Sequence, residues 1–348
     1  MTPTSRISLM TLLALAGTLL VAPGSPSRAT AAATTVLKVA LIVPRSPTVA
    51  LEEKKYNQRL ADLTGGQVQV RVYWGGAAGD EKDVVRKMRT GQIDVTALGL
   101  DVLSQFVREA MVLTTPGLYS NYRQVDAVRK ELTPQFNDEA YRNGFKIMGW
   151  GDVGRLRLFS KQSVTHISDF RHIRPWLYPE SQMLKEFYRV VGATGVPLSI
   201  AEVYGGMQTG MIDTFWSTAV MAGALQWART AKYVSAEGLG FISGAFVFRR
   251  GAWDPLSDVA KKAIQDIANE RRDQAQEDIR KADDRAFAKL MTRGYIGLRA
   301  ADPNEWWEAG KKLRRQMVGR LYTADIVDRA EKIALKYATK DQLAFYGK

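Results

Sequence analysis

The sequence contains no cysteine and only two histidines. Without cysteine there can be no disulfide bond, so burial of a hydrophobic core has to stabilise the fold. Neither His166 nor His172 has a second histidine or a cysteine at ligand spacing, so a metal site would need distant carboxylates. We therefore expect no metal and no cofactor, and we expect surface or capping roles for both histidines.

Motifs for covalent catalysis are also missing, because neither G-x-S-x-G nor S-x-x-K occurs. The segment GWGDVG (Gly149 to Gly154) matches G-x-G-x-x-G, but a strand-like alternation follows it. A dinucleotide site needs a helix there, since the helix N-terminus holds the pyrophosphate. These glycines are instead expected to allow a hinge. We predict a protein that is not an enzyme, and an exported hydrolase or isomerase is the alternative from another class.

No apolar run is long enough to span a membrane. The longest, Leu9 to Ala22, has 14 residues, short of the roughly 20 that a spanning helix needs. It follows a positively charged start and precedes the small-x-small site Ala29-Thr30-Ala31. This order predicts a cleaved secretory signal peptide over residues 1–31, with an uncleaved anchor helix as the alternative. The remaining 317 residues or so are enough for two domains of ordinary size.

Basic residues are in excess but form no block. The formal charge is +13, and loss of Arg6 and Arg28 with the signal peptide leaves +11. Such a balance can indicate nucleic acid, anionic lipid or an acidic partner protein. Because the cations are interspersed with acids and no nucleic-acid-binding motif occurs, we exclude nucleic acid as a partner.

Strand and helix patterns alternate through the first part of the mature chain. Residues 36–45 form a β-branched run, 48–63 a helical segment that stops at Gly65-Gly66, and 67–74 a clean polar–apolar alternation. A further helix then precedes the strand-like segment IDVTALGL. This rhythm predicts an α/β fold with a mainly parallel sheet.

A short pattern occurs twice. Segments 88–98 and 207–217 share M-x-T-G-x-I-D, in which a helix ends on glycine before a short strand. The pattern suggests two α/β lobes with similar corners. Ligands bind beyond the carboxyl ends of strands in such sheets, so Leu100, Phe215 and Trp216 are candidates for a cleft.

The C-terminal part is expected to be helical. A pattern of about 40 residues, from Pro255 to near Arg293, would make a helix that bends or spans both lobes. Two more helices are expected near 304–321 and 325–337. We place lobe 1 at 36–152 with a return segment at about 240–270, and lobe 2 at 153–239 with C-terminal helices at about 280–348.

Aromatic residues stand near predicted strand ends or the expected hinge. Taken together they favour a binding crevice with apolar walls, and they are Trp74, Trp150, Trp176, Tyr178, Phe215, Trp216 and Trp227. In IRPWLYPES (Ile173 to Ser181), a period of two places Arg174, Trp176 and Tyr178 on one strand face. These three residues form either a ligand site or a structural stack of two aromatic rings with an arginine on top.

The segment Asp169 to Asp213 resembles a known family. Its elements are Asp169-Phe170-Arg171, Gly192-Ala193, Val196-Pro197, Glu202-Val203-Tyr204 and Gln208-Thr209-Gly210 through Asp213. They are similar to the central motif of the substrate-binding proteins of tripartite ATP-independent periplasmic (TRAP) transporters. The segment TGGQVQVRVYWGGAAGDEKDVVRKMRTGQIDV and the long C-terminal helix support the resemblance over nearly the whole mature chain.

One departure from the family concerns the ligand. Counted from Asp169, the family's carboxylate-clamping arginine falls at Trp176, and its polar pair after Asp213 is replaced by Trp216-Ser217. A subgroup with Trp in the Arg slot and L-Q-W downstream (Leu225-Gln226-Trp227) resembles this pattern. The resemblance implies a hydrophobic or amphipathic ligand. The alternative is an organic acid held by Arg174, about 6.6 Å from the expected slot.

The resemblance also implies an architecture and a role. We expect a monomeric, periplasmic, two-lobe binding protein that closes about the strands near Trp150 and Phe241 and presents its ligand to a membrane permease. Trp74, Leu100 and Pro116 would contribute from the first lobe, and Trp176, Tyr178 and Trp216 from the second.

Overall fold

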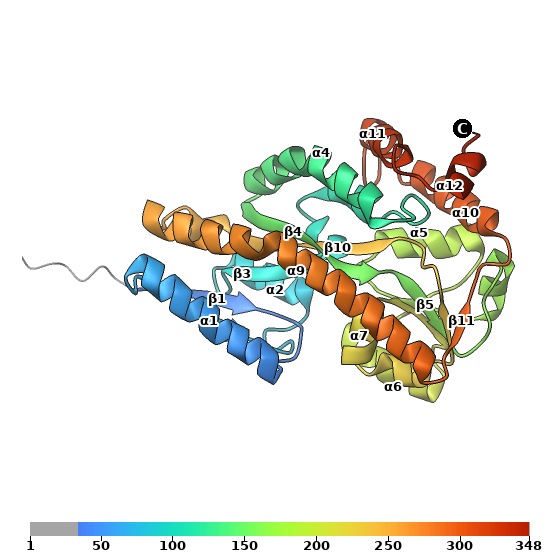
Figure 1. Ribbon diagram of the computed structural model, residues 1–348, viewed down its shortest axis with the longest axis horizontal. Coiled ribbons are helices and arrows are strands. Elements are labelled where there is room, and N and C mark those ends of the chain that lie inside the picture. Colours follow the sequence, from blue (N-terminus) through green and yellow to red (C-terminus); the bar gives the residue numbers. More distant parts are fainter. Residues whose placement is uncertain (1–33, 348) are drawn as a thin grey trace, which may run out of the picture. The chain divides into compact units, whose positions relative to one another are not determined.

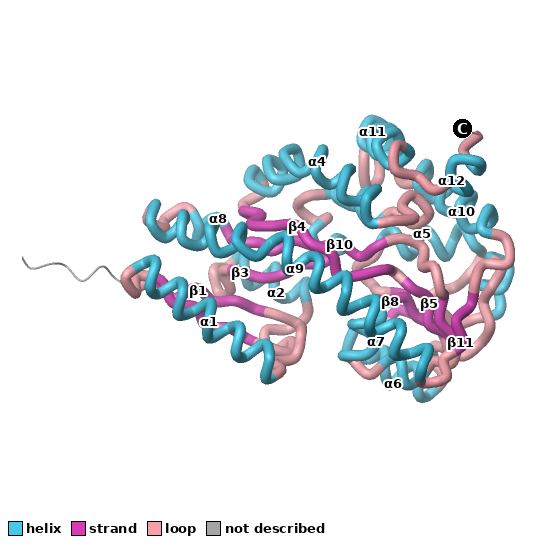
Figure 2. The backbone as a smooth tube through the Cα atoms, in the orientation of Figure 1, coloured by secondary structure: helices cyan, strands magenta, loops and turns pink. Residues whose placement is uncertain are grey.

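The computed structural model describes residues 34–347 (Figures 1 and 2). The expected signal peptide lies outside the described residues. No described helix has both the length and the apolar character needed to cross a membrane. The first sheet has the strand order β2-β1-β3-β10-β4. Its strands are β1 (Thr35–Ala40), β2 (Val68–Tyr73), β3 (Val95–Gly99), β4 (Phe145–Arg155) and β10 (Phe241–Arg249).

The first sheet is mixed. Strand β1 pairs in parallel with both β2 and β3, as predicted. Strand β10 is antiparallel to β3 and to β4, so the prediction of a mainly parallel sheet is wrong for this half. The reason is topological: β10 comes from the return segment and is inserted between β3 and β4, where sequence neighbours could not indicate it.

The helices of this region bury one face each. They are α1 (Pro47–Thr64), α2 (Glu81–Arg89), α3 (Leu100–Leu103), α4 (Tyr122–Arg142) and α8 (Arg250–Trp253). In α2, Asp80 caps the first turn by accepting the Asp83 amide at 2.9 Å, which satisfies a donor without an intrahelical partner. The apolar face of α2 is buried through Val84, Val85 and Met88.

The second sheet has the order β11-β9-β5-β8. It consists of β5 (Arg157–Ser160), β8 (Thr214–Ser217), β9 (Tyr233–Ser235) and β11 (Ile296–Leu298), and a two-residue pair lies beside it, β6 (Trp176–Leu177) with β7 (Val196–Pro197). Its helices are α5 (Gln182–Val191), α6 (Val203–Thr209) and α7 (Ala219–Ala224). The repeated pattern recurs as expected, because α2 ends before Gly91 and α6 before Gly210, both with positive φ.

Two chain segments connect the sheets. Strand β4 continues into β5 through Leu156, and β9 returns into β10 through residues 236–240. The segments bond to each other, since the Leu156 amide donates to the Gly240 carbonyl and the Leu239 amide to the Leu156 carbonyl, both at 3.0 Å. The segment GWGDVG lies inside β4 and is followed by β5, so a strand comes after it and not a helix, as predicted.

The long helix is continuous. Helix α9 (Asp258–Thr292) runs past β4 and on toward α7 (Figure 1). Its buried Asp283 accepts the Arg155 and Val220 amides, each at 3.1 Å. Gly154 allows this, because a Cβ there would lie 2.7 Å from the Asp283 carboxyl carbon. The chain ends in α10 (Pro303–Gln316), α11 (Ala324–Leu335) and α12 (Lys340–Phe345), of which α12 was not expected.

Both histidines have the surface or capping roles predicted for them. His166 precedes the short 3-10 helix Ile167–His172, and its Nδ1 lies 3.2 Å from the Glu305 Oε1. His172 is exposed. Within residues 34–347, no group of His, Cys, Asp and Glu is arranged to hold a metal ion.

Candidate functional site

Acidic side chains stand at the carboxyl end of β3. Glu81 is the first residue of α2, and its Oε1 accepts the Gly99 amide at 3.2 Å. Asp101 lies in α3, which begins directly after β3. Helices thus begin at both positions, and a helix N-terminus favours a carboxylate. The fold therefore gathers two acids at the edge of the sheet where ligands bind in related architectures.

Aromatic rings of the second sheet form a continuous row. Phe159 stacks on Phe215 with ring centroids 5.0 Å apart, and Phe215 meets Trp227 edge-on at 5.5 Å. Trp227 meets Trp176 edge-on at 5.3 Å, and Trp176 contacts Tyr178 at 6.0 Å. Such geometries let the rings bury apolar area with favourable quadrupole alignment. The row leads from the core of the second sheet outward to Tyr178.

Tyr178 is where the aromatic row meets the acids. Burial raises the pKa of its hydroxyl, and the charges of Glu81, Asp101, Asp80 and Glu180 raise it further. Burial likewise raises the pKa of Glu81 to about 7, against one opposing hydrogen bond from Gly99. Glu81 and Asp101 of the first sheet region therefore lie within electrostatic range of the Tyr178 hydroxyl.

Polar contacts join the same two regions. Lys82 forms an ion pair with Glu180 at 2.8 Å. Burial raises the pKa of Asp101, and the Ser181 hydroxyl beside it offsets this in part. Ser181 also caps α5 by accepting the Leu184 amide at 3.1 Å. The start of α5 is therefore held against the starts of α2 and α3.

Two polar atoms at these elements have no hydrogen-bond partner among residues 34–347. They are the hydroxyl oxygen of Tyr178 and the indole Nε1 of Trp74, and both atoms are buried. Trp74 directly follows β2, at the same edge of the sheet as Leu100. A buried donor without a partner is costly, so these atoms mark positions where a polar ligand atom would be stabilised.

The structure places the remaining expected residues in different surroundings. Leu100 is buried at the start of α3, beside Asp101. Trp150 lies against Phe136 of α4 and donates to Asn137 at 2.9 Å. Trp216 stacks on Phe170 with centroids 6.2 Å apart. The Pro116 carbonyl lies against Gly310 of α10.

Arg174 lies away from the aromatic row. Its side chain is 62% exposed, and its Nε is 3.5 Å from the Asp213 carboxylate. Trp176 instead has its indole nitrogen satisfied by the Leu198 carbonyl at 2.8 Å. The alternation of the strand thus brings Trp176 and Tyr178 together, whereas Arg174 ends at the surface beside Gly210.

Glu81, Asp101 and Ser181 are site residues that the sequence did not indicate. A carboxylate at the start of a helix is usually a solvated N-terminal charge, and GDEKDVV gives no further signal. The orientation of Glu81 toward the end of β3 comes from its bond to the Gly99 amide, which is a tertiary contact. Its meeting with Tyr178 depends on contacts between segments about 100 residues apart.

Comparisons with known proteins give one consistent result. A model of bacterial extracellular solute-binding protein, family 7, matches residues 39–320. A solute-binding protein of Verminephrobacter eiseniae is 22% identical over 76% of this chain and 80% of its own length. An uncharacterized Salmonella typhimurium protein is 27% identical, and there the match spans about half of each chain, 45% of this one and 48% of the relative.

A solved structure has the same fold. It is a TRAP periplasmic solute-binding protein from Roseobacter denitrificans with bound β-D-glucuronate, and the TM-score is 0.77. The alignment covers 86% of this chain and 99% of that one at 17% identity. The two-lobe α/β fold expected from the sequence is thereby confirmed.

Proposed function

Because the chain belongs to the bacterial extracellular solute-binding protein family 7, we propose that it binds a small hydrophobic or amphipathic molecule and delivers it to a TRAP-type membrane permease. The family consists of periplasmic solute-binding proteins and not of enzymes. Transport by such a protein requires a ligand that favours one arrangement of the two lobes over another. The ligand class and the site residues are the parts that we propose.

The observation that carries the proposal is the junction of Trp176 and Tyr178 with Glu81. One side offers apolar rings, and the other offers carboxylates that can accept hydrogen bonds. Lys82, the cation beside Glu81 in the sequence, is already paired with Glu180 and its side chain is 61% exposed. A ligand with an apolar body and a hydroxyl or amine group would satisfy both sides, whereas a free carboxylate would face like charges.

Binding would couple the two sheets. Glu81, Asp101 and Trp74 belong to elements of the first sheet, and Trp176 and Tyr178 to the second. A ligand that contacts both sets would stabilise the arrangement in which Lys82 meets Glu180. The connecting segments at Leu156 and Leu239 are where we place the hinge. Export through a cleaved signal peptide and a monomeric state belong to the same proposal.

A second candidate is an organic acid held through Arg174. It is favoured by the structural relative with bound β-D-glucuronate, which carries a carboxylate. Arg174 is exposed and weakly paired with Asp213 at 3.5 Å, so its guanidinium could turn toward a ligand. In that arrangement the cation, and not the indole of Trp176, would determine affinity.

Two substitutions separate the candidates. We expect Trp176→Ala to reduce affinity for the co-purifying ligand about 100-fold, as loss of a buried aromatic anchor costs about 3 kcal/mol. Arg174→Gln should leave affinity within about twofold. Isothermal titration with the extracted ligand measures both, and circular dichroism confirms that each variant is folded. Unchanged affinity in Trp176→Ala would reject the site, and abolished binding of an organic acid in Arg174→Gln would establish the second candidate.

A further inference from the structure

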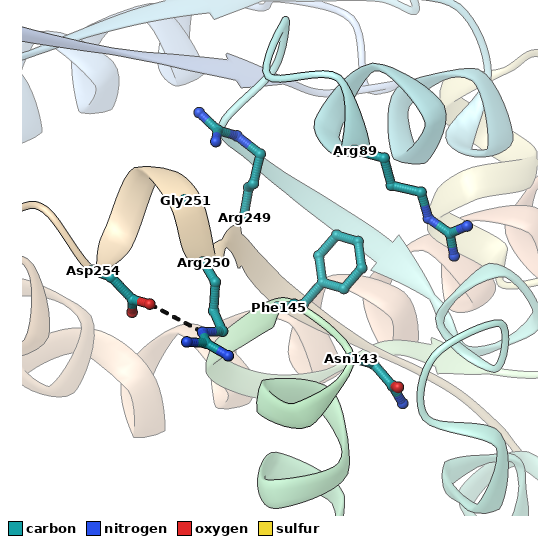
Figure 3. Close-up of a pocket in the computed structure, with 8 residues that line it drawn as sticks. Arg89, Asn143, Phe145, Arg249, Arg250, Gly251 and Asp254 are labelled. Atoms are coloured by element: carbon teal, nitrogen blue, oxygen red, sulfur yellow. Dashed lines mark hydrogen bonds and ion pairs between the residues drawn. The ribbon is translucent and has the colours of Figure 1, made fainter.

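A pocket of about 460 Å³ opens at the opposite edge of the first sheet. Its walls come from the end of α2, the turn before β4 and the junction of β10 with α8. Figure 3 shows its side chains as sticks, with Phe145 between Arg89 and Arg249 in that view. The lining residues are Arg89, Asn143, Gly144, Phe145, Arg249, Arg250, Gly251 and Asp254. Three guanidinium groups therefore share this pocket with one carboxylate.

Neighbouring groups hold the guanidinium of Arg249 in place. Its Nη2 donates to Asp94 at 2.8 Å, and the second oxygen of Asp94 accepts the Lys38 amide at 3.0 Å. Two glycines leave room around it: a Cβ at Gly91 would lie 3.7 Å from its central carbon, and one at Gly251 would overlap its Nη1. Its Nε is buried and has no partner within the described chain. Arg249 is thus a fixed cation with donors left over.

Arg250 and Arg89 add charge from two further elements. Arg250 donates to Asp254 at 3.0 Å and to the Tyr141 carbonyl at 3.3 Å, and its guanidinium lies 4.3 Å from the Tyr141 ring centroid. Arg89, the last residue of α2, has no ion-pair or hydrogen-bond partner in residues 34–347. The carboxylates of Asp94 and Asp254 therefore balance two of the three cations, and one positive charge is uncompensated.

The floor of the pocket is rigid and apolar. Phe145 is buried and stacks on Phe106 with ring centroids 4.1 Å apart. Asn143 is oriented by donating to the Phe106 carbonyl at 2.7 Å. Phe145 and Asn143 are thus held by their own contacts, whereas the exposed side chain of Arg89 can turn toward a bound anion.

This pocket is separate from the place where Tyr178 lies near Glu81. Arg249 pairs with the residues at the start of β3, since its amide donates to the Asp94 carbonyl at 2.8 Å. Glu81 bonds to Gly99 at the other end of the same strand. At about 3.3 Å per residue, the five residues from Asp94 to Gly99 separate the two places by roughly 16 Å.

We propose that this pocket binds an oxyanion of the phosphate class. A guanidinium matches two oxygens of such a group at once, and donors from α2 and from the β10–α8 junction can reach a tetrahedral anion from different directions. The phosphate can be free, or it can belong to the headgroup of a phospholipid at the membrane beside which a periplasmic protein works. Phosphate from either source would bind whether or not a ligand occupies the proposed site at Trp176 and Tyr178.

The test is a titration of the purified mature protein with inorganic phosphate, at constant ionic strength set by chloride. The expected result is a saturable rise in melting temperature and a shift of the Arg249 Nε–Hε NMR signal. Arg89→Gln should weaken phosphate binding about tenfold, as expected for a lost charge-assisted hydrogen bond. Arg86→Gln is the matched control, because this residue lies on the same helix, is 74% exposed and is outside the pocket.

A second arm separates the two sources. Sedimentation with phosphatidylglycerol vesicles, compared with phosphatidylcholine vesicles, shows whether a headgroup is bound. Binding in either arm that is reduced by Arg89→Gln and kept by Arg86→Gln supports the proposal. It is overturned if phosphate has no effect beyond that of chloride and the vesicles do not bind, or if the two variants lose binding equally.

Discussion

Asp152 and Glu81 are both carboxylates of the first sheet region, but their neighbours differ. Asp152 is completely buried between Arg129, whose Nη1 is 2.6 Å away, and Arg280 of α9, whose Nε is 2.8 Å away. Asp126 bonds to the same two arginines. Around Glu81, the charges that act on its pKa are those of Asp101 and Asp80, and both raise it.

The pKa directions follow from these neighbours. Burial raises the pKa of Asp126, but the bonds and charges of Arg280 and Arg129 outweigh it and hold that pKa below its usual range. Burial raises the pKa of Glu81 to about 7, and no cation offsets it. Paired charges therefore hold α4, β4 and α9 together, whereas no cation offsets the burial of Glu81 and Asp101 near Tyr178, which is typical of groups in a binding site.

The largest effect is expected at the paired cluster. Asp152→Asn removes one charge and leaves the buried Arg129 and Arg280 short of a partner, which should lower the free energy of unfolding by about 3 kcal/mol. Urea unfolding at neutral pH measures this. Asp278→Asn on the exposed face of α9 is the control, because Asp278 is exposed and accepts a bond from Gln274. An equal, small loss in both variants would contradict a structural role for the cluster.

A smaller effect, with a definite sign, is expected at Glu81. The pKa of Glu81 is about 7 in the folded state against 4.5 as the ordinary value. Between these two pH values the folded protein therefore binds more protons than the unfolded chain. The free energy of unfolding falls as pH rises from about 4.5 to 7.

Glu81→Gln should remove that dependence. We expect the stability of the variant relative to the natural protein to rise by about 1 kcal/mol between pH 5 and pH 8, after allowance for solvent screening of a half-buried group. Thermal unfolding across this pH range measures it. Asp83→Asn, on the same helix, controls for the loss of a charge near the helix N-terminus. A pH-independent difference would show that Glu81 is not desolvated.

The smallest effect is expected at the surface ion pair that joins the first and second sheet regions. Lys82→Gln removes the exposed ion pair with Glu180, and surface pairs contribute little to stability. We expect no measurable change in the unfolding midpoint, but a salt-dependent shift toward separated lobes in small-angle scattering without ligand. A profile that is identical to that of the natural protein at every salt concentration would show that this pair does not bias the arrangement.

The first strands and helices could be predicted from the sequence, because the patterns that indicate them are local. The alternation in QVQVRV, the double glycine after α1 and the length of α9 each depend on neighbours in the chain. The position of β10 between β3 and β4 and the meeting of Glu81 with Tyr178 depend on distant segments. Trp150 shows the limit at the site: it stands in a glycine-rich strand near the proposed hinge, but its indole donates to Asn137 of α4.

The central claim is that the site takes an apolar or amphipathic ligand on Trp176 without an arginine clamp. Mass spectrometry of an organic extract of the protein, isolated from the periplasmic fraction, tests this most directly. We predict a hydrophobic or amphipathic molecule that co-purifies with the natural protein and with Arg174→Gln, but not with Trp176→Ala. A small organic acid that is retained by Trp176→Ala and lost from Arg174→Gln would contradict it.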